Sequence, residues 1–169
     1  MPEIPDLTVY VEALEERVVG AELEDVRIVS PFLLRTVTPP VSELVGKRVQ
    51  GVRRLAKQLV VGLEDDYFIV IHLMISGRLQ WHEAKKPVPK RNGLAAFDFS
   101  TGTLTLTEAS KKKRASLKLV RGTEDLTALD PGGIEVLTCS LDEFAERLRA
   151  TNHTLKRALT DQRVFAGIG

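Results

Sequence analysis

Residues 21–120 are a succession of short β-rich runs separated by turn signals, and this pattern restricts the fold more than any other feature. The run over residues 103–107 alternates threonine and leucine at period two, as a half-buried strand does. Glu64, Asp65 and Asp66 interrupt two apolar runs and predict a hairpin turn. Several short strands at such spacing are typical of a β-sandwich or barrel. The runs expected to be strands are residues 26–29, 48–55, 59–63, 68–73, 77–81 and 103–107.

Helical patterns flank the β-rich region on both sides. Apolar residues repeat at helical spacing from Leu7 to Val18 behind an acidic start, and Gly20 ends the pattern. After an expected linker at residues 129–133, Ser140 and Glu143 have the spacing of a capping box and predict a helix over Leu141–Arg149. A second short helix is expected to begin at residue 153.

The expected fold class is therefore α+β and mainly β. It consists of a two-sheet β-sandwich with an N-terminal helix, followed by a short helical C-terminal segment. We expect two parts in the chain: a β-sandwich domain at residues 1–126, and a linker with helices at residues 127–169. A chain of 169 residues is long enough for one domain with a sizeable core and a small appendage.

Composition indicates the kind of environment the chain occupies. A hydrophobic share of 43% and a charged share of 28% are ordinary for a soluble globular protein. Cys139 is the single cysteine, so the chain forms no internal disulfide and no structural zinc site is expected within it. The longest apolar stretch, residues 68–75, is too short to span a bilayer, and no signal peptide is expected. These features predict a cytoplasmic protein without membrane attachment.

The positive charges are clustered although the net charge is only +1. Fifteen of the 24 basic residues lie in three windows, whereas acidic residues crowd the first 25 positions. Any one window could be a solvated face, but three of them on one short chain make a polyanionic partner an equal alternative. The windows contain Lys47, Arg48, Arg53, Arg54 and Lys57; Lys85, Lys86, Lys90 and Arg91; and Lys111, Lys112, Lys113, Arg114, Lys118 and Arg121.

The first three residues carry candidate chemistry. Pro2 is small enough behind Met1 for the initiator to be removed, which would leave proline as a free secondary amine. An α-amino group titrates at about pH 8, so part of it is unprotonated at neutral pH and can attack a carbon at the aldehyde level to form an iminium ion. Glu3 is a carboxylic acid within reach of that carbon. The alternative is that Met1-Pro2-Glu3 simply begins a helix, where proline and acids are both favoured.

Four segments together resemble the formamidopyrimidine-DNA glycosylase and endonuclease VIII family of base-excision repair enzymes. Residues 1–6 are similar to the family's MPELPE start, and residues 53–57 to its RR-x-x-K strand. Residues 72–79 are close to HLGMSGxL. Residues 155–162, running into Gly167-Ile168-Gly169, are similar to the opening of the family's helix–two-turn–helix element. The matches follow the same order at similar spacing and cover essentially the whole chain.

The resemblance implies catalytic roles for three residues. Pro2 would attack the anomeric carbon of a damaged nucleotide, and Glu3 would protonate the sugar oxygen as the ring opens. Lys57 would hold the phosphate beside the lesion and assist proton transfer. On the residues alone, Lys57 could also be a surface lysine whose stem lies along apolar neighbours. The implied activity is that of a bifunctional glycosylase and AP lyase that cuts the strand by successive eliminations.

The resemblance also implies contacts with damaged double-stranded DNA, for which a damaged base must leave the stack. Ile75 stands where the family has a gap-filling methionine, and it could equally be plain strand core. Lys113 and Arg114 are the nearest equivalents of the family's other two gap-filling residues, although residues 111–115 contain no aromatic residue. Arg54 and Lys156 match further basic family positions near the DNA, and Lys156 could equally be on a solvated face.

The implied partner is damaged DNA, bound by a monomer in the bacterial cytoplasm. The family's zinc is held by a C-terminal finger whose cysteines do not occur in these 169 residues, so no cofactor is expected in this chain. Two other possibilities follow from these departures. One is a non-catalytic relative that binds damaged DNA, and the other is a truncated, inactive piece of such an enzyme.

Overall fold

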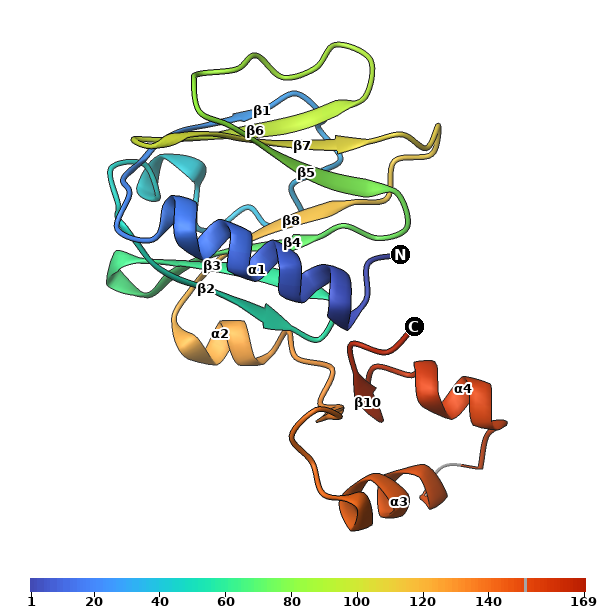
Figure 1. Ribbon diagram of the computed structural model, residues 1–169. Helices are drawn as coiled ribbons and strands as arrows, with labels where there is room; N and C mark the ends of the chain where they lie inside the picture. The colour runs from blue at the N-terminus through green and yellow to red at the C-terminus, as the bar shows by residue number, and fades with distance from the viewer. Residues whose placement is uncertain (151) are drawn as a thin grey trace.

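Two four-stranded antiparallel sheets pack face to face in the computed structural model, which describes residues 1–150 and 152–169 (Figure 1). The order in one sheet is β1 (Leu23–Ile28), β6 (Gly93–Phe99), β7 (Gly102–Glu108) and β5 (Gly77–His82). The order in the other is β2 (Val49–Leu55), β3 (Gln58–Leu63), β4 (Tyr67–His72) and β8 (Ser116–Arg121). The expected two-sheet β-sandwich is therefore confirmed.

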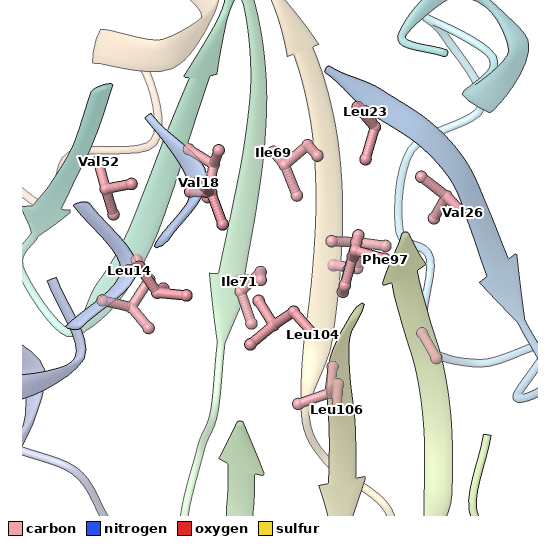
Figure 2. Close-up of a cluster of buried hydrophobic side chains, with 14 of the residues drawn as sticks. Leu14, Val18, Leu23, Val26, Val52, Ile69, Ile71, Phe97, Leu104 and Leu106 are labelled. Atoms are coloured by element: carbon pink, nitrogen blue, oxygen red, sulfur yellow. The ribbon is translucent and has the colours of Figure 1, made fainter. Parts of the chain in front are cut away.

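The core lies between the two sheets, where apolar side chains from both inner faces meet (Figure 2). Ile69 and Ile71 of β4 point toward Phe97 of β6 and Leu104 of β7. Complete burial of an aliphatic or aromatic side chain contributes roughly 1.5–3 kcal/mol, so this cluster holds the two sheets together. The short helical turns η1 (Val41–Glu43) and η2 (Glu64–Asp66) connect strands at its edges, and η2 forms the expected hairpin turn.

Helix α1 (Ile4–Val18) closes one side of the sandwich and packs along β2. Leu7, Leu14 and Val18 are buried, which is the apolar stripe expected from the sequence. Glu3 is the N-cap residue, and its backbone N–H donates to the Asp6 carboxylate over 3.0 Å. The expected first helix is confirmed, and its amino end is held at a defined place on the sandwich.

The C-terminal segment is helical, as expected. It follows α2 (Thr123–Thr127), which packs against β8 of the sandwich, and contains β9 (Ile134–Glu135), α3 (Leu141–Arg149), α4 (Leu155–Thr160) and β10 (Phe165–Ala166). Ser140 and Glu143 form the expected capping box at the start of α3, while α4 begins at Leu155, two residues later than expected. The Phe144 and Phe165 rings stack at 4.4 Å, which joins α3 to the β9–β10 pair. No helix within residues 1–150 and 152–169 is long and apolar enough to cross a membrane.

Two strands of the sandwich, β6 and β8, were not evident from the sequence, nor were the two-residue strands β9 and β10. Strand β6 is buried on both faces after Gly93 and contains consecutive alanines, so it lacks the period-two alternation that marks a half-buried strand. Strand β8 belongs to a basic window, yet its Leu117 and Leu119 are buried while Lys118 is only half-buried. Their assignment depends on pairing with β1 and β7 in one sheet and with β4 in the other.

Candidate functional site

The amino end of α1 lies beside the tip of the β2–β3 hairpin. In this hairpin Leu55 pairs with Gln58, so Ala56 and Lys57 form the two-residue turn. Ala56 has a φ of 49°, in the left-handed region that non-glycine residues seldom occupy. Lys57 is only 6% exposed, so it is not a surface lysine of the kind that the sequence also allowed. A strained turn thus holds a buried cation next to the first residues of the chain.

Lys57 and Glu3 interact electrostatically. Burial lowers the pKa of Lys57 below the usual 10.5, and the nearby Glu3 carboxylate opposes that shift without cancelling it. A Cβ atom placed on Gly169 would stand 2.7 Å from both Glu3 Oε1 and Lys57 Nζ. The Glu3 carboxylate and the Lys57 ammonium therefore both lie close to Gly169. Gly169 can approach them because glycine has no side chain.

Pro2 is buried next to this pair and borders a small cavity of about 100 Å³. The other residues that line the cavity are Met1, Asp6, Tyr10 and Arg78. Sequence reasoning did not single out Tyr10 or Arg78 as site residues. Arg78 could have been found, because it lies inside the segment at residues 72–79 that carries the family resemblance. The two interpretations of Met1-Pro2-Glu3 do not exclude each other, since Glu3 caps α1 while Pro2 lines a cavity.

Residues 167–169 approach this site, joined to α1 by one backbone hydrogen bond and held in shape by Gln162. The Ile4 backbone N–H donates to the Gly167 carbonyl over 3.3 Å. The Gln162 side chain accepts from the Gly167 N–H over 2.8 Å and donates to the Ile168 carbonyl over 2.7 Å. Gln162 is a structural residue that the sequence did not reveal, because its role depends on a turn that only the tertiary structure forms.

Arg54 links the same region to the C-terminal segment. Its guanidinium donates to the Ala56 carbonyl over 2.8 Å and forms an ion pair with Glu135 of β9. The Arg54 side chain is largely buried by these contacts. It therefore connects the β2–β3 hairpin with β9, a role in addition to the DNA contact predicted from the sequence.

The other sequence-predicted site residues lie on loops. Ile75 is 57% exposed in the turn between β4 and β5, so it is not the core residue that the sequence also allowed. Arg114 is exposed in the β7–β8 loop, and the Lys113 ammonium donates to the Glu108 backbone carbonyl. Figure 1 shows the β4–β5 turn, the β7–β8 loop and the N-terminus at the same end of the sandwich. Lys156 is exposed on α4, in the separate C-terminal segment.

A basic hollow joins two of the three charged windows. It has a volume of about 690 Å³ and lies between the β5–β6 and β7–β8 loops. The residues that line it are Arg91, Asn92, Ala109, Ser110, Lys111 and Lys113. Three cations and no acid on its walls create a local field that attracts anions, despite the small net charge of the chain.

His72 has a structural role. Its Nδ1 accepts a hydrogen bond from the Met74 backbone N–H over 3.1 Å, which shapes the turn that carries Ile75. Burial and the neighbouring Lys57 and Lys118 lower the pKa of His72, so the neutral ring that accepts this bond is favoured. His72 is thus a hydrogen-bonded strand histidine with a structural role.

The fold and site together define a class of protein. In this class a β-sandwich, a buried lysine in a hairpin turn and a C-terminal segment form one site at the amino end of the first helix. Comparison with known families identifies the class. Residues 1–117 match the family described as the formamidopyrimidine-DNA glycosylase N-terminal domain, and the chain belongs to this family.

Individual relatives agree with this assignment. The formamidopyrimidine-DNA glycosylase of Ligilactobacillus salivarius (strain UCC118) is 27% identical over 175 residues, which cover 100% of this chain and 62% of the relative. That of Cereibacter sphaeroides (strain ATCC 17025 / ATH 2.4.3) is 29% identical over 180 residues, covering 100% and 64%. The structure of MutM in complex with DNA containing carbocyclic 8-oxo-G has a TM-score of 0.86 at 25% identity, covering 99% of this chain and 64% of that one. The chain therefore spans less than two thirds of the length of these relatives.

Proposed function

We propose that this chain acts on damaged double-stranded DNA in base-excision repair, as the catalytic N-terminal part of a DNA glycosylase with AP-lyase activity. The observation that carries the proposal is the buried Lys57 beside Glu3, next to Pro2 at the amino end of α1. The names of its relatives, and the DNA in the MutM complex, support the substrate class.

The proposed reaction begins when removal of Met1 frees the Pro2 nitrogen. The amine attacks the anomeric carbon of the damaged nucleotide, the bond to the base breaks, and Glu3 protonates the sugar oxygen as the ring opens. The resulting iminium cation withdraws electrons from the neighbouring carbon, which loses a proton. The 3′ phosphate leaves by β-elimination and the 5′ phosphate by δ-elimination, and water then releases the proline.

The loops around the site supply the proposed DNA contacts. Ile75 would enter the gap that the extruded base leaves, because its apolar side chain is exposed at a turn. Arg114, exposed on the neighbouring β7–β8 loop, would enter the same gap, and the basic hollow and Lys156 would bind phosphates. Arg54 stays a predicted contact as well. We propose further that the chain works as a monomer in the bacterial cytoplasm and that the Pro2 chemistry requires no cofactor.

The second candidate is a non-catalytic protein that binds damaged DNA, and one observation favours it: residues 111–115 lack the aromatic gap-filling residue of the family. The decisive experiment incubates Met1-free protein with a duplex containing an abasic site and borohydride. We expect a covalent adduct and, without borohydride, strand cleavage. Binding that weakens steeply with salt but yields neither adduct nor cleavage would identify the non-catalytic protein instead.

Lys57 gives the proposed phosphate contact a distinctive pH dependence. Because its pKa is lowered, the ammonium loses its proton as pH rises through a value below 10.5, and the charge that attracts phosphate is lost. We expect affinity for a duplex with a tetrahydrofuran abasic analogue to fall by about tenfold across that step, the effect of losing one charge-assisted hydrogen bond. Fluorescence anisotropy between pH 7 and 10 measures it.

Lys57→Arg is the matched control for this experiment. The guanidinium keeps its charge over the whole range, so the variant should bind with little pH dependence. An equal decline in the wild-type protein and the variant would show that another group is responsible and would contradict the role of Lys57.

A further inference from the structure

Glu108, the last residue of β7, is a buried acid that the proposed chemistry does not use. It is 1% exposed. Its Oε2 accepts hydrogen bonds from the backbone N–H groups of Arg114, over 2.9 Å, and Ala115, over 3.1 Å. Its Oε1 accepts from the Ser76 hydroxyl over 3.3 Å. One carboxylate thus joins the β4–β5 turn to the β7–β8 loop.

The backbone of Glu108 adds contacts at the same place. Its N–H donates to the Asn92 carbonyl over 2.9 Å, and its carbonyl accepts from the Lys113 ammonium. Glu108 also pairs directly with Gly77 across the β5–β7 ladder. Three loops therefore converge on this residue: the turn at residues 73–77, the β5–β6 loop at its Asn92 end, and residues 109–115.

The hydrogen bonds to the buried Glu108 carboxylate restrict the conformation of both loops. A buried carboxylate is costly unless its oxygens are hydrogen-bonded, and bonds from N–H groups to an ionised acid are stronger than neutral ones. If the carboxylate were removed, the N–H of the buried Ala115 would lose its acceptor. The loop would then have little to hold it in one conformation.

The residues held by Glu108 are adjacent to those predicted to enter the DNA. Ser76 follows Ile75 directly, and Arg114 is itself held by its backbone while its side chain remains exposed. We propose that Glu108 is a positioning residue that fixes Ile75 and Arg114 relative to each other, so that both can enter the gap left by an extruded base. This inference rests on the proposed function and deepens it, because Glu108 acts through the two loops and touches no DNA.

The test compares Glu108→Ala with Glu108→Gln in the 169-residue chain. Glutamine can turn its amide so that the oxygen accepts from both N–H groups while the NH₂ group donates to the Ser76 hydroxyl, and it should preserve the arrangement. Alanine removes both side-chain acceptors and leaves only the backbone carbonyl. Thr105→Val is the matched control, because Thr105 is buried in the middle of β7 and hydrogen-bonds Gln80 and His82 but neither loop.

Affinity is measured for a duplex with a tetrahydrofuran abasic analogue and for the same duplex undamaged. We expect Glu108→Ala to lower the preference for the abasic duplex at least about tenfold, the cost of losing a preorganised contact. Glu108→Gln and Thr105→Val should stay within about twofold of wild type. A preference kept by Glu108→Ala, or lost equally in Glu108→Gln, would overturn the proposal.

Hydrogen exchange at the Arg114 and Ala115 amides provides a readout that needs no DNA. Exchange should become at least about tenfold faster in Glu108→Ala and change little in Glu108→Gln, because only alanine removes the acceptor. Unchanged exchange in Glu108→Ala would refute the claim that the Glu108 carboxylate holds this loop. By contrast, a wild-type protein with slow exchange at both amides but no preference for abasic DNA would refute the proposed function.

Discussion

Replacing Pro2 by glycine in Met1-free protein is expected to reduce the borohydride-trapped adduct with abasic DNA at least about hundredfold. A hundredfold change corresponds to roughly 2.7 kcal/mol in the barrier. A proline amine forms an iminium that carries a permanent positive charge, whereas the imine of a primary amine must first be protonated. Glycine also lacks the ring that holds the nitrogen in its buried position beside Glu3. The adduct is measured on a denaturing gel as the fraction of labelled DNA retained by protein.

Two controls isolate the nitrogen of Pro2. Pro5→Ala changes an exposed proline in the first turn of α1, and we expect adduct yield within about twofold of wild type, since Pro5 lies outside the catalytic set. Protein that retains Met1 should give no adduct, because its Pro2 nitrogen is an amide and cannot attack. An adduct of undiminished yield in Pro2→Gly, or from the Met1-retaining form, would end the claim that Pro2 is the nucleophile.

Gly167→Ala is expected to destabilise the protein by about 2–4 kcal/mol, through backbone strain and overpacking combined. Gly167 has a φ of +84°, which disfavours any residue with a Cβ. A Cβ there would lie 2.4 Å from Ile4 Cγ1 and 2.9 Å from an Arg54 guanidinium nitrogen. Neither neighbour can yield easily, because Ile4 is branched at Cβ, which restricts its χ1 rotation, and Arg54 is held by Ala56 and Glu135.

Gly132→Ala is the matched control for Gly167→Ala. Gly132 has nearly the same φ, +83°, but no atom lies within 4 Å of the position its Cβ would take. It should cost only about 1 kcal/mol of backbone strain. Urea denaturation gives both values. Equal losses in the two variants would mean that the docking of residues 167–169 on α1 contributes nothing to stability.

Much of the fold could be predicted from the sequence, because in those segments the local sequence pattern agrees with the tertiary structure. The stripe from Leu7 to Val18 became α1, and the acidic break at residues 64–66 became the turn between β3 and β4. Strand β6 was not readable, since burial on both faces removes the alternation on which such a prediction depends. The two-residue delay of α4 reflects the weak signals at helix starts.

The sequence alone determined the chemistry available to this protein: an amine that trimming can free at Pro2, an acid at Glu3, and basic windows that attract anions. It left two questions open, whether Lys57 is a buried cation or a surface lysine, and whether Ile75 belongs to the core or to a turn. Only the tertiary structure decided these, because burial depends on which distant segments pack against a residue. Glu108 shows the same dependence, since its partners come from loops more than thirty residues apart in the chain.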